Sequence, residues 1–186
     1  MKKINNKSGF TLVEVLVSTA LFVIIITAAM NIFKLVIESQ RSAIATQNVE
    51  ESLKYFLEVT GKEVRMAKRN NGVCSSLGLA PTDIYKISSN AYGDTISFKN
   101  YHDECVTYNI VQMPDGNKRF MITRDSLTNY YITPAKITID ELHFVLGASA
   151  QPTVTMELVA HALGSAANKS TMRIQTTLSS RYYKTD

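Results

Sequence analysis

The sequence contains no Trp, four Pro and only two Cys in 186 residues, and these shortages narrow the class of protein. Cys74 and Cys105 lie far apart, with no Cys-x-x-Cys spacing and no His pair near them, so they make a poor metal site. The chain also lacks the G-x-S-x-G, H-E-x-x-H and phosphate-loop patterns, and its histidines are scattered: His102, His143 and His161. We therefore expect no catalytic residues, no cofactor and no metal, and do not expect an enzyme.

Charge is missing from one long stretch near the N-terminus. Nineteen consecutive residues, Val15 to Phe33, carry no charged side chain. This length is close to the roughly 20 apolar residues that cross a bilayer as a helix. Lysines precede the stretch within residues 1–9, and positive residues that flank a span stay in the cytoplasm. We expect a single-pass protein of the inner membrane whose residues 40–186 face outward.

The net charge of +4 is concentrated in the same place. Removing residues 1–9 leaves 17 Lys and Arg against 16 Asp and Glu, a net charge of +1. The basic balance therefore belongs to the N-terminal segment and says little about ligands of the remaining chain. Nucleic acid is disfavoured as a partner, although it stays open as an alternative.

The apolar stretch begins with an unusual motif, Gly9-Phe10-Thr11-Leu12-Val13-Glu14. An ordinary secretory signal places its cleavage site behind the apolar region, where Ser18-Thr19-Ala20 is only a faint candidate. A lone carboxylate inside a membrane costs at least ~2.5 kcal/mol, so Glu14 is a candidate functional residue. The segment from Lys2 to about Ile37 resembles the type IV prepilin family, in which a Gly is followed by Phe-Thr-Leu-x-Glu and an apolar run.

The resemblance implies a processing event and a set of partners. A prepilin peptidase is expected to cut between Gly9 and Phe10 on the cytoplasmic face and to N-methylate the new Phe10 amine. Glu14 would then meet the amine of a neighbouring pilin or pseudopilin subunit within lipid, where each charge needs a partner. Alternatively, Glu14 simply lies at the headgroup level. An inner-membrane assembly platform is a further implied partner.

Export would also decide the state of the two cysteines. In an oxidising compartment, a disulfide between Cys74 and Cys105 is expected, worth roughly 3–4 kcal/mol in the loop-entropy model. Two unpaired thiols in a reducing compartment are the alternative.

The helical pattern continues beyond the apolar stretch, because apolar residues recur at intervals of three or four as far as Ala67. No Pro occurs from Phe10 to about Lys68, and Asn70-Asn71-Gly72 is expected to end the helix. Lys62, Arg65, Lys68 and Arg69 are expected to be solvated and to complement the helix dipole. Four parts follow: a leader (1–9), a membrane-spanning or filament-core helix (10–37), an amphipathic distal stalk (38–69) and a globular head (70–186).

The head is expected to be an antiparallel sheet packed on the distal stalk helix, which gives an α+β fold. Residues 72–93 show no clear period and are expected to be irregular. Pro114-Asp115-Gly116-Asn117 predicts a hairpin turn. Strands are expected at Asp94–Lys99, Cys105–Met113, Lys118–Arg124, Lys136–Leu146, Val154–His161 and Thr171–Tyr182.

The order of the head elements resembles one subgroup of the family, the J-type minor pseudopilins and PilW-like minor pilins. The resemblance rests on Ile122-Thr123-Arg124, Ile132-Thr133-Pro134, the strand to Phe144 and the closing run from Ile174 to Arg181. It implies a minor subunit of a type IV pilus or type II secretion filament, in a complex at the filament tip. A pilin-like module that binds DNA or a surface ligand is the alternative.

Overall fold

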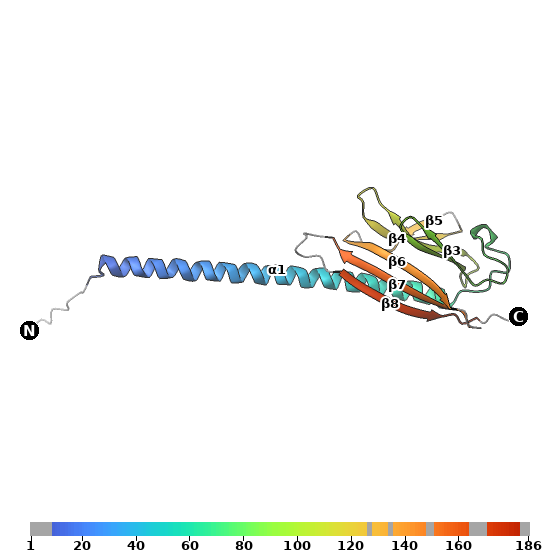
Figure 1. Ribbon diagram of the computed structural model, residues 1–186, viewed down its shortest axis with the longest axis horizontal. Helices are drawn as coiled ribbons and strands as arrows, with labels where there is room; N and C mark the ends of the chain where they lie inside the picture. The colour runs from blue at the N-terminus through green and yellow to red at the C-terminus, as the bar shows by residue number, and fades with distance from the viewer. Residues whose placement is uncertain (1–8, 126–127, 134–135, 148–150, 164–170, 183–186) are drawn as a thin grey trace, which may run out of the picture. The chain divides into compact units, whose positions relative to one another are not determined.

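The computed structural model describes residues 9–125, 128–133, 136–147, 151–163 and 171–182. One long helix, α1 (Leu12–Arg65), precedes all the strands (Figure 1). A short 3-10 helix (Ser75–Leu77) follows it. Eight strands complete the order: β1 (Tyr85–Asn90), β2 (Gly93–Lys99), β3 (Cys105–Gln112), β4 (Lys118–Arg124), β5 (Thr128–Tyr131), β6 (Ile137–Gly147), β7 (Thr153–Ala162) and β8 (Thr171–Ser179). The chain divides into two compact units between Arg41 and Ser42.

The strands form two antiparallel sheets rather than the single sheet expected from the sequence. One has the order β1-β2-β3-β4-β5 and the other the order β6-β7-β8. The two sheets are joined by contacts between side chains and backbone. Thr138 of β6 accepts a hydrogen bond from the Lys118 amide of β4 at 2.9 Å, and Asp94 of β2 accepts one from the Phe144 amide of β6 at 3.0 Å. The α+β class is thus confirmed, with the strands divided between two meanders.

The distal part of α1 supplies the helical side of the core. Its buried side chains include Val49, Leu53 and Phe56, spaced as on one helix face. Phe56 stacks on Phe120 of β4 with ring centroids 3.7 Å apart, and the Leu178 side chain of β8 lies over Gly61. Both sheets therefore pack on this part of the helix.

α1 ends earlier than expected. The sequence placed the end at Asn70-Asn71-Gly72, but the helix stops at Arg65. The Lys68 amide donates instead to the Lys99 carbonyl at 2.9 Å, so the chain already lies beside the last residue of β2. Asn71 and Gly72 do adopt the left-handed geometry expected of them, with φ of 52° and 83°, within the following turn.

Two strands, β1 and β5, were not predicted from the sequence. Residues 72–93 were expected to be irregular, but β1 occupies Tyr85–Asn90 and pairs with β2 across a two-residue turn. The Asn90 side chain accepts hydrogen bonds from the amides of Tyr92 and Gly93, which closes this turn. Gly93 has a φ of 150° and lies against the Leu142 carbonyl, where a Cβ would be only 3.0 Å from the oxygen. β5 is a short edge strand whose Tyr130 and Tyr131 are about half exposed.

The remaining strands agree closely with the sequence. The turn at Pro114-Asp115-Gly116-Asn117 is confirmed, since the Met113 amide donates to the Asn117 carbonyl at 2.8 Å. β6 carries a bulge between Ile139 and Glu141, which shifts its alternation so that Leu142 and Phe144 are buried as well. β8 ends at Ser179, three residues before the expected Tyr182, and the Ser180 amide bonds the Pro152 carbonyl instead.

Candidate functional site

The N-terminus of α1 begins directly after the expected cleavage site. The Thr11 hydroxyl accepts a hydrogen bond from the Glu14 amide at 3.3 Å, and the Thr11 carbonyl accepts one from the Val15 amide at 3.2 Å. Thr11 is therefore the N-cap of the helix, and Glu14 stands at the third helical position, the spacing of a capping box. The N-cap role of Thr11 was not predicted from the sequence, although the Thr-x-x-Glu spacing is present in the motif.

Gly9 and Phe10 lie outside the helix and are exposed, with Phe10 77% accessible. No atom lies within 4 Å of the position that a Cβ on Gly9 would occupy. Phe10 lines an apolar depression together with Val15 and Phe22, which belong to the first turns of α1. An apolar residue before the N-cap that meets one in the first turns fixes the direction of chain entry. The peptide bond between Gly9 and Phe10 is thus accessible and is not held in helical hydrogen bonding.

Glu14 lies in the first turn of α1, and its side chain is exposed. A carboxylate at this position is favoured by the positive end of the helix dipole. Within the parts of the chain that the structure describes, no cation forms an ion pair with it. The carboxylate is therefore available to a partner from outside those residues.

The hydroxyl groups of the apolar stretch find hydrogen-bond acceptors within the helix. Ser18 and Thr19 donate hydrogen bonds to the carbonyls of Glu14 and Leu16 at 2.7 and 3.0 Å, and Thr27 donates to the Val23 carbonyl. In hydrocarbon such groups need partners within the segment, so this arrangement suits a membrane helix. Among the described residues, α1 is the one helix long and apolar enough to span a bilayer. Its large apolar side chains between Leu12 and Ile37 are exposed among the described residues of the first unit, which suits contact with lipid or with other chains.

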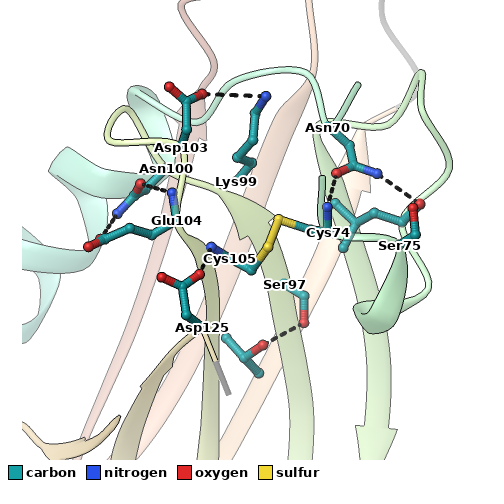
Figure 2. Close-up of a disulfide and its surroundings, with 12 residues drawn as sticks. Asn70, Cys74, Ser75, Ser97, Lys99, Asn100, Asp103, Glu104, Cys105 and Asp125 are labelled. Atoms are coloured by element: carbon teal, nitrogen blue, oxygen red, sulfur yellow. Dashed lines mark hydrogen bonds and ion pairs between the residues drawn. A yellow bond between two sulfur atoms is a disulfide. The ribbon is translucent and has the colours of Figure 1, made fainter. Parts of the chain in front are cut away.

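The expected disulfide is present: Cys74 and Cys105 are joined, with Cα atoms 5.5 Å apart (Figure 2). A buried asparagine precedes each cysteine and organises its loop. The Asn70 side chain accepts from the Cys74 amide at 2.6 Å, while Asn100 accepts from the amides of His102 and Glu104. The bond links the loop after α1 to the start of β3.

A charged cluster around this loop neutralises the acidic pair Asp103 and Glu104. Asp103 lies 3.1 Å from Lys68 and 3.5 Å from Lys99, and the hydrogen bond from Lys68 lowers the pKa of its carboxyl. Glu104 accepts hydrogen bonds from Asn100 and Arg124, which lower its pKa against the opposing effect of burial. The carboxylate oxygens of this acidic pair are thus already compensated by cations of the chain. Lys68 is an ion-pair partner here, not the solvated cation expected.

A second cluster ties α1 to the five-stranded sheet. The Glu63 carboxylate, 8% exposed, pairs with Arg124 of β4 and accepts a hydrogen bond from the Tyr108 hydroxyl of β3 at 2.6 Å. Burial, together with the nearby Glu63 charge, raises the Tyr108 pKa. Glu63 and Arg124 are 61 positions apart, so no local pattern could have joined them. The cluster holds the helix in register on the sheet.

The histidines lie apart in the structure as well. His143 and His161 are on β6 and β7, as expected, and lie against different carboxylates, Asp94 at 3.5 Å and Asp140 at 2.7 Å. His102 lies in the loop before β3. Among the described residues, no three His, Cys, Asp or Glu side chains gather as metal ligands would.

Comparison with known protein families gives a match in the N-terminal segment. No curated protein and no solved structure matches the chain significantly. The family model described as the prokaryotic N-terminal methylation motif matches residues 4–30. Together with the apolar helix, this motif fits a single-pass inner-membrane protein and suggests a structural subunit of the pilin or pseudopilin kind rather than an enzyme. The chain carries a prepilin-type signal, which implies processing by a prepilin peptidase and assembly with other pilins.

Proposed function

We propose that the chain is a minor pilin or pseudopilin, processed between Gly9 and Phe10, methylated on Phe10 and assembled into a type IV pilus or type II secretion filament. The observation that carries this proposal is the match to the methylation motif at residues 4–30, which covers most of the charge-free, exposed stretch of α1 from Val15 to Phe33. A helix that is apolar on all faces is stable in lipid before assembly, and among similar helices of other subunits after it.

The orientation follows from the same segment. The lysines within residues 1–9 hold the N-terminus in the cytoplasm, and the part of the chain after the span lies outside the inner membrane. The Cys74–Cys105 disulfide supports this orientation, because such bonds persist in oxidising compartments. The place of the subunit at a filament tip rests on the short sequence runs of the head, such as Ile122-Thr123-Arg124 and Ile174 to Arg181, that resemble those of minor pseudopilins.

Glu14 is the residue to which we assign assembly. Its carboxylate is exposed and has no ion-pair partner among the described residues. Cleavage creates a cationic amine at Phe10 about one helical turn away, and the amine of one subunit pairs with Glu14 of the next. Inside lipid this pairing removes two uncompensated charges at once.

The test compares Glu14→Ala with Glu38→Ala, a matched control on an exposed acid of the same helix. Both variants are expected to be processed normally, and only Glu14→Ala is expected to be lost from sheared or cross-linked filament fractions. Normal incorporation of Glu14→Ala would contradict the assembly role. If neither variant were processed, cleavage between Gly9 and Phe10 would depend on acidic residues elsewhere on α1. That result would contradict a cleavage site that the peptidase recognises independently of the assembly residue.

A further inference from the structure

β8 forms an open edge of the three-stranded sheet. It pairs with β7 along its length, and no strand pairs with its other side among the residues that the structure describes. Met172, Ile174 and Thr176 point to the inner face but are only partly buried. Their register partners on β7, Ala160, Leu158 and Met156, are fully buried. The core of this sheet is therefore covered at its centre and open along β8.

The usual protection of a sheet edge is missing from β8. Natural edge strands are short, carry Pro or inward charges, or are covered. β8 has nine residues and no Pro. Its one charged residue, Arg173, points to the outer face and pairs there with Glu157 at 2.9 Å. By contrast, the opposite edge strand β6 packs against the five-stranded sheet through Thr138 and Phe144. The exposed backbone of β8 can therefore pair with a further strand.

A groove of about 670 Å³ runs between β8 and the distal part of α1. Its lining includes four buried or half-buried nonpolar residues, which we call its floor: Leu57, Gly61, Met66 and Leu178. A strand added to β8 would place every second side chain over this floor, because side chains alternate between the faces of a sheet. The groove thus supplies side-chain pockets beside an open backbone edge.

The rim of the groove is positively charged. Lys62 and Arg65 of α1 and Arg181 after β8 line it, against the single acid Glu58. All four are exposed, and no acidic side chain in the described parts of the chain forms an ion pair with the three cations. Lys54, further back on the same helix, is by contrast paired with Glu50. The rim therefore favours a partner that brings negative charge.

We propose that the β8 edge and the adjoining groove bind an extended acidic segment of another exported protein, which adds as a fourth strand to the sheet. Main-chain hydrogen bonds to β8 supply affinity, the apolar floor selects alternate side chains, and the cationic rim selects acidic ones. The inference does not depend on processing of the N-terminal segment. A second copy of the chain fits less well, because it would bring the same cationic rim to the seam.

The first test measures binding of synthetic nine-residue peptides to the full chain in detergent micelles by fluorescence anisotropy. The acidic probe alternates Val and Glu, and the control probe alternates Val and Lys. We expect the acidic probe to bind and Lys62→Glu/Arg65→Glu to weaken it roughly tenfold, since two exposed charges are reversed. The matched variant Lys54→Glu, on the same helix away from the groove, is expected to bind as the wild type does. Equal binding of both probes, or no binding tighter than about 1 mM, would overturn the proposal.

The second test separates strand addition from attraction by charge alone. Two forms of the acidic probe carry N-methyl groups on alternate amides, in opposite phases, so that only one form keeps its amides free toward β8. Strand addition predicts that one form binds and the other does not. Equal binding of the two forms would overturn it. A dimer of the chain that persists in Lys62→Glu/Arg65→Glu and excludes the peptide would assign the edge to a second copy and would also overturn it.

Discussion

Phe33 and Phe56 stand on the same helix, but their surroundings are opposite. Phe33 is 68% exposed, and the other large apolar side chains of the first part of α1 are exposed as well. Phe56 is only 2% exposed, and its ring stacks on that of Phe120. The first part is apolar on every face, and no described residue of its own unit covers it. The later part is amphipathic and is covered by two sheets. One helix thus combines a surface that needs other molecules with a surface that the chain completes itself.

The largest effect is expected from a substitution in the part of α1 that packs on the two sheets. Phe56→Ala should lower the free energy of unfolding of the head by about 3–5 kcal/mol, because it removes a buried ring and leaves a cavity. Phe33→Ala is the matched control and should leave it unchanged. Both are measured by denaturant titration of the full chain in micelles, followed by the near-ultraviolet circular dichroism of its tyrosines. Equal losses from both variants would show that the two parts of α1 do not differ as described.

The disulfide should act on the head alone. Cys74→Ser/Cys105→Ser is expected to lower the free energy of unfolding by roughly 3–4 kcal/mol, since the bond closes a loop of 31 positions in the unfolded chain. The helical signal of α1 in micelles should persist at low denaturant. Adding a reductant should shift the midpoint of the wild type and leave the double variant unchanged. A wild-type midpoint that ignores the reductant would contradict a stabilising bond.

The ion pair between helix and sheet is expected to contribute less. Arg124→Met leaves the Glu63 carboxylate buried and uncompensated. A fully buried pair would lose roughly 3–5 kcal/mol, and because the Arg124 side chain is 29% exposed we expect about 2 kcal/mol. Arg173→Met removes an exposed pair and should cost less than about 1 kcal/mol. Adding Glu63→Gln to Arg124→Met should recover part of the loss, and a further loss would contradict the assigned pairing.

The sequence predicted what is encoded locally. Glu14, the charge-free stretch, the turn at Pro114–Asn117 and the long helix can each be recognised from residues that are close together in the sequence. β1 was missed because most of its side chains are exposed and its turn is closed by the Asn90 side chain rather than by a familiar turn pair. The division into two sheets and the joining of Glu63 to Arg124 are tertiary, since they bring together residues with no sequence relation.

The smallest expected effect on stability concerns the start of α1. Thr11→Val keeps the shape of the side chain but removes the N-cap acceptor, which costs the first turn about 1 kcal/mol. We expect slower processing between Gly9 and Phe10, because the helix start beside the cut loses its definition. Thr11→Ser restores the acceptor and should restore the rate, as measured by the ratio of precursor to mature chain over time. Equal processing of the Val and Ser variants would show that the cap does not position the cleavage site.

The most direct test of the proposed role is intact-mass and fragment analysis of the chain isolated from membranes that contain a prepilin peptidase. We predict a mature chain that begins at Phe10, lacks residues 1–9 and carries the mass of one methyl group on its N-terminal amine. A chain that still begins at Met1 in the presence of an active peptidase, or one cut behind the apolar stretch, would contradict the account.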